Sequence, residues 1–289
     1  MKFGRTYNVV VQGRSRTWTF GYPITCNMRV STDGTPTCNK AHFYFFNLPE
    51  NMRNDITRDT FDNDLTIRSI IFAAGYTSDT QLPVLFAGSL FWAFSYRKGA
   101  DWITEMECFD GGEAIQNGSI EATFSKDADS RQILRALVLA MPNVNPGSIS
   151  TNVFKGERTR GLAISGNPWD ELIRRILPEN AQAFISNGVV HVIAQNEYLP
   201  LHGALGELSA DTGMIGSPRR SDIMTTITLV FEPRMKIGQK VSVISSEPYA
   251  GDGKVMKIFH AGMISPSNCG ELTTMVTLFR SPELVEVAA

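Results

Sequence analysis

Four acidic residues lie within ten positions of one another: Asp101, Glu105, Glu107 and Asp110. Glycoside hydrolysis uses two carboxyl groups that flank the scissile bond, so this segment is the first candidate for cell-wall cleavage. Residues 101–109 alternate in polarity as a β-strand does, which puts Glu105 and Glu107 on one face. Acids that alternate along a strand usually form a solvated face, and no partner acid lies in a pocket-like context. We expect no catalytic residue, and a peptidoglycan hydrolase that uses Glu105 or Glu107 stays the alternative.

The four histidines give no metal-binding signal. His42, His191 and His260 each fall in an alternating strand-like segment, and His202 follows Pro200 in a loop. No two of them have the HxH or HxxxH spacing that places two imidazoles on one ion. A structural role is expected for each of them.

The segment Gly-Asp-Gly-Lys at residues 251–254 has only part of a phosphate-binding loop. A Walker loop needs four residues between its first glycine and the Gly-Lys pair, then Ser or Thr, and a helix that holds the phosphate. Val255 follows the lysine, and the next segment is strand-like, so we expect a hairpin turn here.

The cysteines Cys26, Cys38, Cys108 and Cys269 lack CxxC spacing, so neither a zinc ribbon nor a thioredoxin motif is indicated. Reduced, partly buried thiols are expected. A Cys26–Cys38 bridge across a hairpin is the alternative. No cofactor and no metal are predicted.

The first third of the chain is predicted to be strand-rich. The expected strands are residues 7–12, 17–22, 41–46, 65–76, 82–96 and 101–109. A helical turn around Ile56 is expected within residues 51–62. The last two strands are joined by Arg97-Lys98-Gly99-Ala100, which indicates a hairpin.

The middle of the chain is predicted to be a compact α+β insert. One helix starts at Asp129 or Ser130 and ends before Pro142, and a second is capped by Asn167 and stopped by Pro178. A hairpin follows, with strands at residues 183–186 and 189–194 around an Asn-Gly turn. Residues 143–160 between the helices are expected to be an exposed loop.

The last third returns to strands. A turn-rich loop from Asp211 leads into an extended segment at residues 222–231, and further strands are expected at residues 240–245, 253–263 and 271–279. Only residues 281–289 lack an expected partner. The order is thus β-rich, α+β and β-rich, and two β-rich parts of similar size suggest a distant internal duplication.

Composition narrows the function further. A chain of 289 residues is long enough for two or three packed units, and 27 basic against 29 acidic residues, without a run of like charge, give little reason to expect nucleic-acid readout. No secretory signal or membrane segment is evident, so we expect synthesis in a cytoplasm. Aromatic residues at 43–46 and 91–96 exceed what one core can hold by alternation, which favours burial against another domain or subunit.

Six blocks of the sequence together resemble the baseplate hub proteins of tailed bacteriophages, particularly those of contractile, Mu-like and related tails. The blocks are AHFYFFNLPENMRNDI, IIFAAGYTSDTQLPVLFAGSLFWAFSYRKGADWITEMECFDG, AFISNGVVHVI, TGMIGSPRRSD, LVFEPRMKIGQKVSVIS and VMKIFHAGMISPSNCGELTTMVTL. The combination of Thr-Gly-Met-Ile-Gly-Ser-Pro with Glu-Pro-Arg-Met and a later glycine is its most specific part.

This resemblance implies a structural protein of the virion, assembled in the cytoplasm of a bacterial host. It implies a homotrimeric ring in the tail baseplate that adapts the hexameric tail tube to the central trimeric spike, with other baseplate proteins around it. The fold class implied is mainly β with an α+β insert: two tube-like β-barrel domains at residues 1–112 and 199–289 flank a small α+β domain at residues 113–198. Strand edges of both barrels are expected to be paired or covered across subunits.

No segment is left over for an added lysozyme-like or lipase-like domain, so we expect a purely structural hub and no enzyme. The hub of a tailocin or secretion-like injection particle is an alternative. Arg219 and Arg220, with Met214 and Ile215, are the candidate interface residues. We expect the two arginines in an exposed loop at a contact between domains or subunits, with solvation as the alternative.

Overall fold

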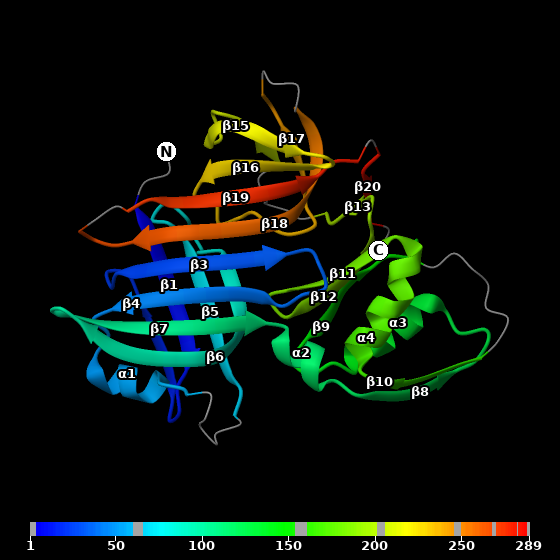
Figure 1. Cartoon of the computed structure of the whole chain (residues 1–289), viewed down its shortest axis with the longest axis horizontal. Helices are drawn as coiled ribbons and strands as arrows, with labels where there is room; N and C mark the ends of the chain where they lie inside the picture. Colours follow the sequence, from blue (N-terminus) through cyan, green and yellow to red (C-terminus); the bar gives the residue numbers. More distant parts are fainter. Residues whose placement is uncertain are drawn as a thin grey trace.

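Strands dominate the N-terminal part of the chain. The computed structural model describes residues 4–59, 66–153, 161–200, 206–245, 250–267, 270–281 and 283–287 (Figure 1). The first elements are β1 (Arg5–Gln12), β2 (Thr17–Gly21), β3 (Cys26–Asp33), β4 (Asn39–Phe46), α1 (Glu50–Ile56), β5 (Arg68–Tyr76), β6 (Val84–Lys98) and β7 (Asp101–Asp110). Five predicted strands and the helical turn are confirmed in this list, and a sixth is confirmed from Arg68 onwards; β3 is an additional strand.

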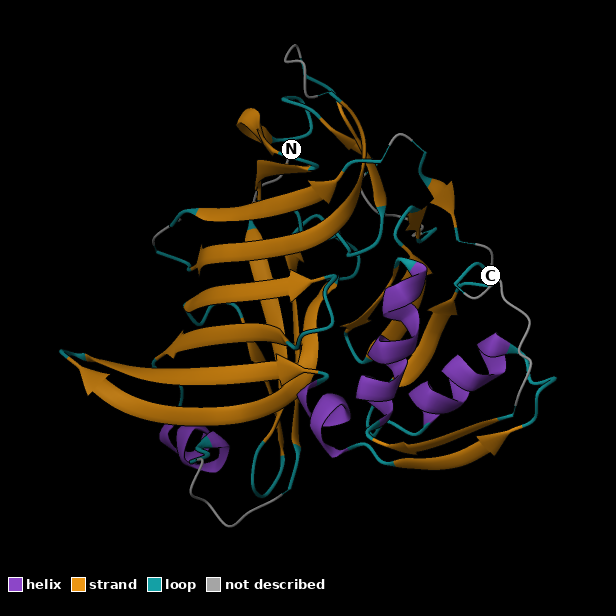
Figure 2. Cartoon of the chain, turned by 45° about the vertical axis from the view of Figure 1, so that its right-hand side comes forward, coloured by secondary structure: helices purple, strands orange, loops and turns teal. Residues whose placement is uncertain are grey.

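The middle part forms an α+β unit that lies to one side of the large sheet (Figure 2). Its elements are α2 (Gly112–Asn117), β8 (Ile120–Phe124), α3 (Ser130–Leu139), β9 (Asn145–Ile149), β10 (Leu162–Gly166), α4 (Pro168–Ile176), the 3-10 turn Leu177–Glu179, β11 (Ala181–Ser186) and β12 (Val189–Ala194). Both predicted helices are confirmed: the side chain of Asp129 accepts the N–H of Arg131, the second residue of α3, and Asn167 accepts two N–H groups of α4.

The hairpin in this unit is confirmed as well, because Asn187 and Gly188 both have positive φ, as its two-residue turn requires. The expected loop at residues 143–160 is wrong in its first part. Residues 145–149 are β9, which pairs in parallel with the outer edge of β12, and Pro146 is tolerated there because β9 has a neighbour on one side only. Residues 154–160 lie outside the described ranges.

The C-terminal part adds β13 (Glu197–Tyr198), β14 (Glu207–Leu208), β15 (Met214–Ser221), β16 (Met224–Val230), β17 (Lys240–Val243), β18 (Gly251–Ile264), β19 (Leu272–Phe279) and β20 (Val285–Glu286). Three expectations fail here. The turn-rich loop expected from Asp211 is strand β15 from Met214 to Ser221. Residues 251–254 are the start of β18, paired with β17, rather than a hairpin turn. Residues 281–289 do have a partner, because β20 pairs with β13.

The two strand-rich parts share one sheet. Its order is β15-β16-β19-β18-β3-β4-β7-β6-β5-β1-β2, with β17 also on β18 and β14 on β17. The junction is the antiparallel pairing of β18 with β3, from Lys257 opposite Asp33 to Ile264 opposite Cys26. The mainly β fold with an α+β insert is confirmed. Separate closed barrels are not seen, because β18 and β3 join the two parts and no pairing among the described strands closes either of them.

The two parts repeat one strand order. Neighbours in the first part are β3, β4, β7 and β6, and in the second β15, β16, β19 and β18. The last strand of each set is long, and it changes partner along its length: β6 begins against β5 and β18 begins against β17. A register slip lies between Leu90 and Trp92 of β6 and between Val255 and Lys257 of β18. Such correspondence is what an internal duplication leaves.

Three hydrophobic clusters lie beneath these elements. The first fills the N-terminal part, the second the α+β unit and the third the C-terminal part. In β4, Phe43 and Phe45 point into the first cluster, where Phe43 stacks on Phe72 with ring centroids 4.5 Å apart, while Tyr44 and Phe46 point outwards. Alternation was expected to bury about half of the aromatic side chains at 43–46 and 91–96; this holds at 43–46, whereas Phe91, Trp92, Phe94 and Tyr96 are all exposed or half-buried.

Candidate interaction surface

The four candidate interface residues all lie on β15, the first strand of the sheet. Arg219 and Arg220 are exposed, as expected, but they belong to a strand rather than a loop. Ile215 is 48% exposed, whereas Met214 is half-buried and packs against the third hydrophobic cluster. Among the described strands β15 pairs only with β16, so beyond Met214, whose N–H donates to the carbonyl of Ser209, its other edge presents backbone N–H and C=O groups to solvent.

Local turn chemistry explains both ends of β15. Gly213 enters the strand at φ 106°, and Asp222, at φ 51°, turns it into β16. Pro218 lies within the strand at a register slip between Ile215 and Arg219. Proline and an irregular register are tolerated at this position because β15 is an edge strand, and they are common means of limiting uncontrolled pairing of such edges.

The second half of β6 is the matching edge at the opposite side of the eight-strand section. Beyond the register slip, β6 pairs with β7 alone, apart from one bridge in which Arg58 and Ala93 exchange two backbone hydrogen bonds. Residues 94–98 have no further strand partner in the described part of the chain. Phe94 is 50% exposed, and its ring stacks on Trp92. Sequence reasoning missed this edge, although the aromatic excess at residues 91–96 indicated an uncovered surface.

The acidic side chains on the outer face of β7 have polar partners on the neighbouring strand. Glu105 and Glu107 do share this face, as predicted. The carboxylate of Glu107 lies 3.5 Å from the His42 imidazole on the neighbouring strand, and Glu105 hydrogen-bonds Tyr44. These acids are thus bonded to neighbours on an open surface, and the two do not flank a cavity as the acid pair of a glycosidase does.

Asp110 fastens the α+β unit to the end of β7. Its buried carboxylate accepts hydrogen bonds from the backbone N–H groups of Asn187 (2.7 Å) and Gly188 (2.9 Å), and from the side chain of Asn39. Burial raises the pKa of Asp110, and the three donors act in the opposite direction by favouring the charged form. The turn of the β11–β12 hairpin is therefore held by a charge-assisted contact.

Lys254 fastens the same unit to the C-terminal part. Its side chain is fully buried, and its amine donates to the backbone carbonyl of Gln195 at 2.5 Å, just after β12. Burial lowers the pKa of the Lys254 amine to about 8. The lysine that resembled part of a phosphate loop is therefore a structural donor inside the protein.

The described histidines have structural surroundings. Burial lowers the pKa of His191 to about 4 and that of His260 to about 3. His191 accepts a hydrogen bond from the backbone N–H of Ser148, and His260 shares one with the hydroxyl of Thr274. His202 lies outside the described residues.

Cys26, Cys38 and Cys108 are free thiols, so the Cys26–Cys38 bridge is wrong. Cys26 starts β3 and points into the first cluster, while Cys38 lies beyond the other end of the β3–β4 pair. Burial raises the pKa of Cys26 and of Cys108. Within the described ranges, no three His, Cys, Asp or Glu side chains converge on a metal site, and no helix has the length and apolar character needed to span a bilayer.

Comparison with solved structures shows where this fold occurs. Neither a protein-family model nor a curated protein matches the chain. The 43 kDa tail protein of prophage MuSo2 from Shewanella oneidensis matches with a TM-score of 0.60 at 10% identity, covering 97% of this chain and 100% of that one. The tail protein of Neisseria meningitidis MC58 gives the same score and identity, with 98% of each chain covered.

A secretion-system protein has the fold too. It is an Escherichia coli component of the type VI secretion system, described as structurally similar to the bacteriophage T4 tail proteins gp27 and gp5. It matches with a TM-score of 0.57 at 8% identity, covering 96% of this chain and 79% of that one. The chain thus has, over nearly its whole length, the fold of these two tail proteins and of the type VI secretion component that is described as similar to gp27 and gp5.

Proposed function

We propose that this chain, which has the fold of phage tail and hub proteins, is the structural hub subunit of a phage-type tail. Three copies form a ring that joins a hexameric tube to a trimeric spike in the virion baseplate. Three hydrophobic clusters, each made mainly of residues from one part, support the division into a first tube-like domain (residues 1–112), an α+β domain (113–198) and a second tube-like domain (199–289).

The observation that carries this proposal is the repeated strand order. Inside one chain, the long strand of the second set (β18) pairs with the first strand of the first set (β3). The long strand of the first set (β6) and the first strand of the second set (β15) are the two edges left open. We therefore expect the contact between copies to repeat the β18–β3 contact inside the chain, so that β6 of one copy pairs with β15 of the next.

The register of that external junction follows from the internal one. We align the two parts from the first paired residue after each register slip and follow the residues that lie opposite one another on successive strands. In the first part these are Trp92 on β6, Glu107 on β7, His42 on β4 and Arg29 on β3. In the second part they are Lys257 on β18, Thr277 on β19, Thr226 on β16 and Arg219 on β15. Arg29 and Arg219 hence occupy equivalent positions. Arg29 lies opposite Ala261 of β18, and the position equivalent to Ala261 in β6 is Tyr96. Arg219 of one copy should thus lie opposite Tyr96 of the next.

Such a contact joins different surfaces of identical chains, and it generates a closed ring when the rotation at each junction is right. Six similar junctions, three within chains and three between them, give a threefold ring an approximately sixfold face. Pairing of both edges also removes the exposed backbone groups that otherwise favour aggregation.

Disulfide trapping tests this ring. In antiparallel strands, the Cα atoms of directly opposite residues are about 4.5–5.5 Å apart, which is within the range of a disulfide. Chains carrying Tyr96→Cys and Arg219→Cys, in a Cys38→Ser and Cys269→Ser background, should form covalent trimers upon mild oxidation. Tyr96→Cys combined with Arg135→Cys on the exposed face of α3 is the control, and should not cross-link.

Mass photometry of the unmodified chain provides a second test that does not depend on register. Three chains of 31.9 kDa give a particle of about 96 kDa. Electron microscopy should show these particles as rings, and a tube or spike protein from the same particle should copurify with them. A strict monomer at micromolar concentration, without cross-links, would contradict the proposal.

The hub of a tailocin or secretion-like injection particle is the second candidate, favoured by the likeness to the type VI secretion component. The two candidates share the ring, and they differ in the particle with which the protein copurifies. The hydrolase alternative predicts clearing of purified peptidoglycan that Glu105→Gln or Glu107→Gln abolishes, and the contacts of these acids with Tyr44 and His42 on an open surface argue against it.

A further inference from the structure

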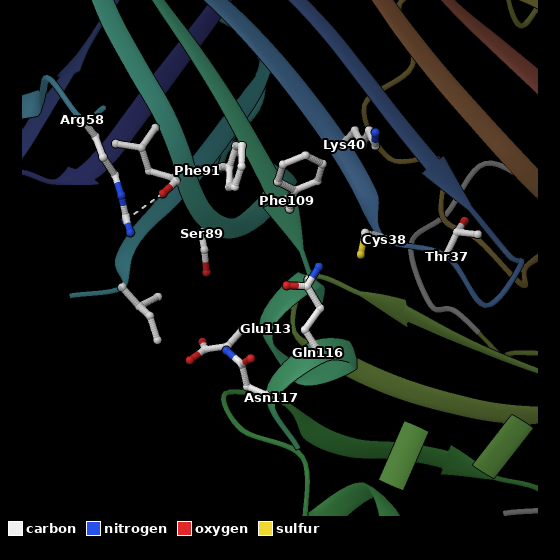
Figure 3. Close-up of a pocket in the computed structure, with 13 residues that line it drawn as sticks. Thr37, Cys38, Lys40, Arg58, Ser89, Phe91, Phe109, Glu113, Gln116 and Asn117 are labelled. Atoms are coloured by element: carbon white, nitrogen blue, oxygen red, sulfur yellow. Dashed lines mark hydrogen bonds between the residues drawn. The ribbon is translucent and has the colours of Figure 1, made fainter. Parts of the chain in front are cut away.

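A groove of about 790 Å³ lies where β6, β7 and β4 approach α2 (Figure 3). Its apolar surface comes from Leu90, Phe91, Phe109 and Ile67, and α2 supplies the polar side opposite. The volume is within the range of about 300–1,000 Å³ that binding pockets have. The end of the groove marked by Arg58 and Phe91 adjoins the open edge of β6.

The backbone of β6 turns Phe91 outwards at this end. Phe91 occupies the register slip between Leu90 and Trp92, so it has no partner on β7, and its side chain is 49% exposed. Its ring centroid lies 5.1 Å from that of Phe109, with the planes at 79°. A β-bulge is a common way to re-aim one side chain, and here it exposes an aromatic ring that packs edge-on against Phe109.

Arg58 limits how far another strand can extend along this edge. Its backbone is bridged to Ala93, and its guanidinium donates to the carbonyl of Leu90 at 2.9 Å. A neighbouring β15 paired in the register derived above places Ser221 opposite Phe94, and it must leave the edge before reaching Ala93. In the chain, β15 does end at Ser221, and the next two residues form its turn.

The side chains of that turn are complementary to those at the groove end, with an acid for Arg58 and an apolar side chain for Phe91. Its residues are Asp222, which is exposed, and Ile223, which is 54% exposed although apolar. We propose that the Asp222-Ile223 turn of one copy docks at the Arg58–Phe91 end of the groove of the next copy, with Ile223 on the Phe91 ring and the Asp222 carboxylate beside the Arg58 guanidinium. This contact rests on the proposed ring and specifies one of its anchors: an apolar side chain buried next to an ion pair of opposite charges.

The test measures the concentration at which trimers dissociate upon dilution, by mass photometry. Ile223→Ser removes the apolar anchor and should weaken assembly about tenfold or more. The matched control is Ile244→Ser, because Ile244 is equally exposed, at 53%, but lies after β17 and belongs to neither β6 nor β15. This control should leave assembly unchanged.

A double-mutant cycle isolates the charge pair. Asp222→Asn keeps the preference for positive φ and removes the charge, and Arg58→Gln removes its partner. Each single change should weaken assembly about threefold, and the double variant should be no weaker than either single one, because the lost interaction is the same. Raising the salt concentration should weaken the wild-type trimer more than the Asp222→Asn trimer.

The outcomes separate this proposal from the ring itself. Absence of trimers in the wild-type protein would overturn both. The docked turn alone would be overturned if trimers form and the Tyr96→Cys and Arg219→Cys positions cross-link, but Ile223→Ser assembles like wild type. It would also be overturned, with the ring intact, if the effects of the two charge variants simply multiply.

Discussion

Replacing Lys254 by methionine should change how the stability of the protein depends on pH. The folded state holds the amine, fully buried, at a pKa of about 8, against 10.5 when it is unperturbed. Because the folded pKa is the lower one, the unfolded chain binds more protons between pH 8 and pH 10.5, so stability rises with pH in this window. Below pH 8 the folded protein bears the full cost of a buried ammonium.

The magnitude follows from that shift. Relative to pH 7, the wild-type free energy of unfolding should gain about 1.4 kcal/mol at pH 9 and about 2.5 kcal/mol at pH 10 over that of Lys254→Met, in which no amine titrates. Urea unfolding of both proteins at pH 7, 8, 9 and 10 measures this difference, in which the titration of all other groups cancels.

The matched control is Lys257→Met on the same strand. Lys257 has a side chain that is 51% exposed, with its amine 3.6 Å from the Asp33 carboxylate, so it pays little desolvation. A Lys254→Met difference no larger than that of Lys257→Met, or one that falls as pH rises, would refute the claim that the Lys254 amine is buried against the carbonyls of Ala194 and Gln195.

Three further predictions address the packing of the sheet. Gly262→Ala should lower the free energy of unfolding by more than about 3 kcal/mol, or prevent folding, because φ is 144° and a Cβ would lie 1.9 Å from the backbone oxygen of Glu271. The control is Gly216→Ala, at φ 71° with open space around it, which should cost only about 1 kcal/mol in thermal unfolding. Asp110→Ala removes the acceptor of the Gly188 N–H and should cost about 2–4 kcal/mol, with faster hydrogen exchange at that amide; unchanged exchange would contradict the role of Asp110. Acidification from pH 7.5 to pH 5 should destabilise the protein by about 2 kcal/mol through His260 alone, because its pKa lies near 3 when folded and near 6.5 when unfolded, and His260→Gln should remove that part of the loss.

Local signals in the sequence were sufficient for α3, α4 and the β11–β12 hairpin of the α+β unit, but not for α2, β8, β9 and β10. Asn167 and Pro168 start a helix by capping geometry alone, and Asn187-Gly188 dictates its two-residue turn. By contrast, β3 was missed although Cys26, Met28 and Val30 alternate with polar residues. Cysteine and methionine are weak strand signals, and the strand is stabilised mainly by its pairing with β18 and β4.

Most of the candidate surface depends on pairings that no local pattern encodes. The Gly and Pro residues near Arg219 predict a loop, but the pairing with β16 makes the segment an edge strand. The open half of β6 follows from the absence of a described neighbour beyond Ala93, which depends on the whole sheet order. The buried environments of Asp110 and Lys254 likewise arise from contacts between parts of the chain far apart in sequence.

Because β6 and β18 each change partner along their length, main-chain pairing determines how the neighbouring strands are oriented, independently of the outward side chains. In β18, one edge holds β17 and then β3, so the angle between these neighbours is set by main-chain hydrogen bonds along a continuous strand. Outward side chains such as Phe259 and Lys257 contribute little to that angle. Evolution can therefore alter what the exposed face binds or repels without changing how successive units are oriented. Divergence of such a protein should be concentrated in its outward side chains, while its strand lengths and register slips are retained.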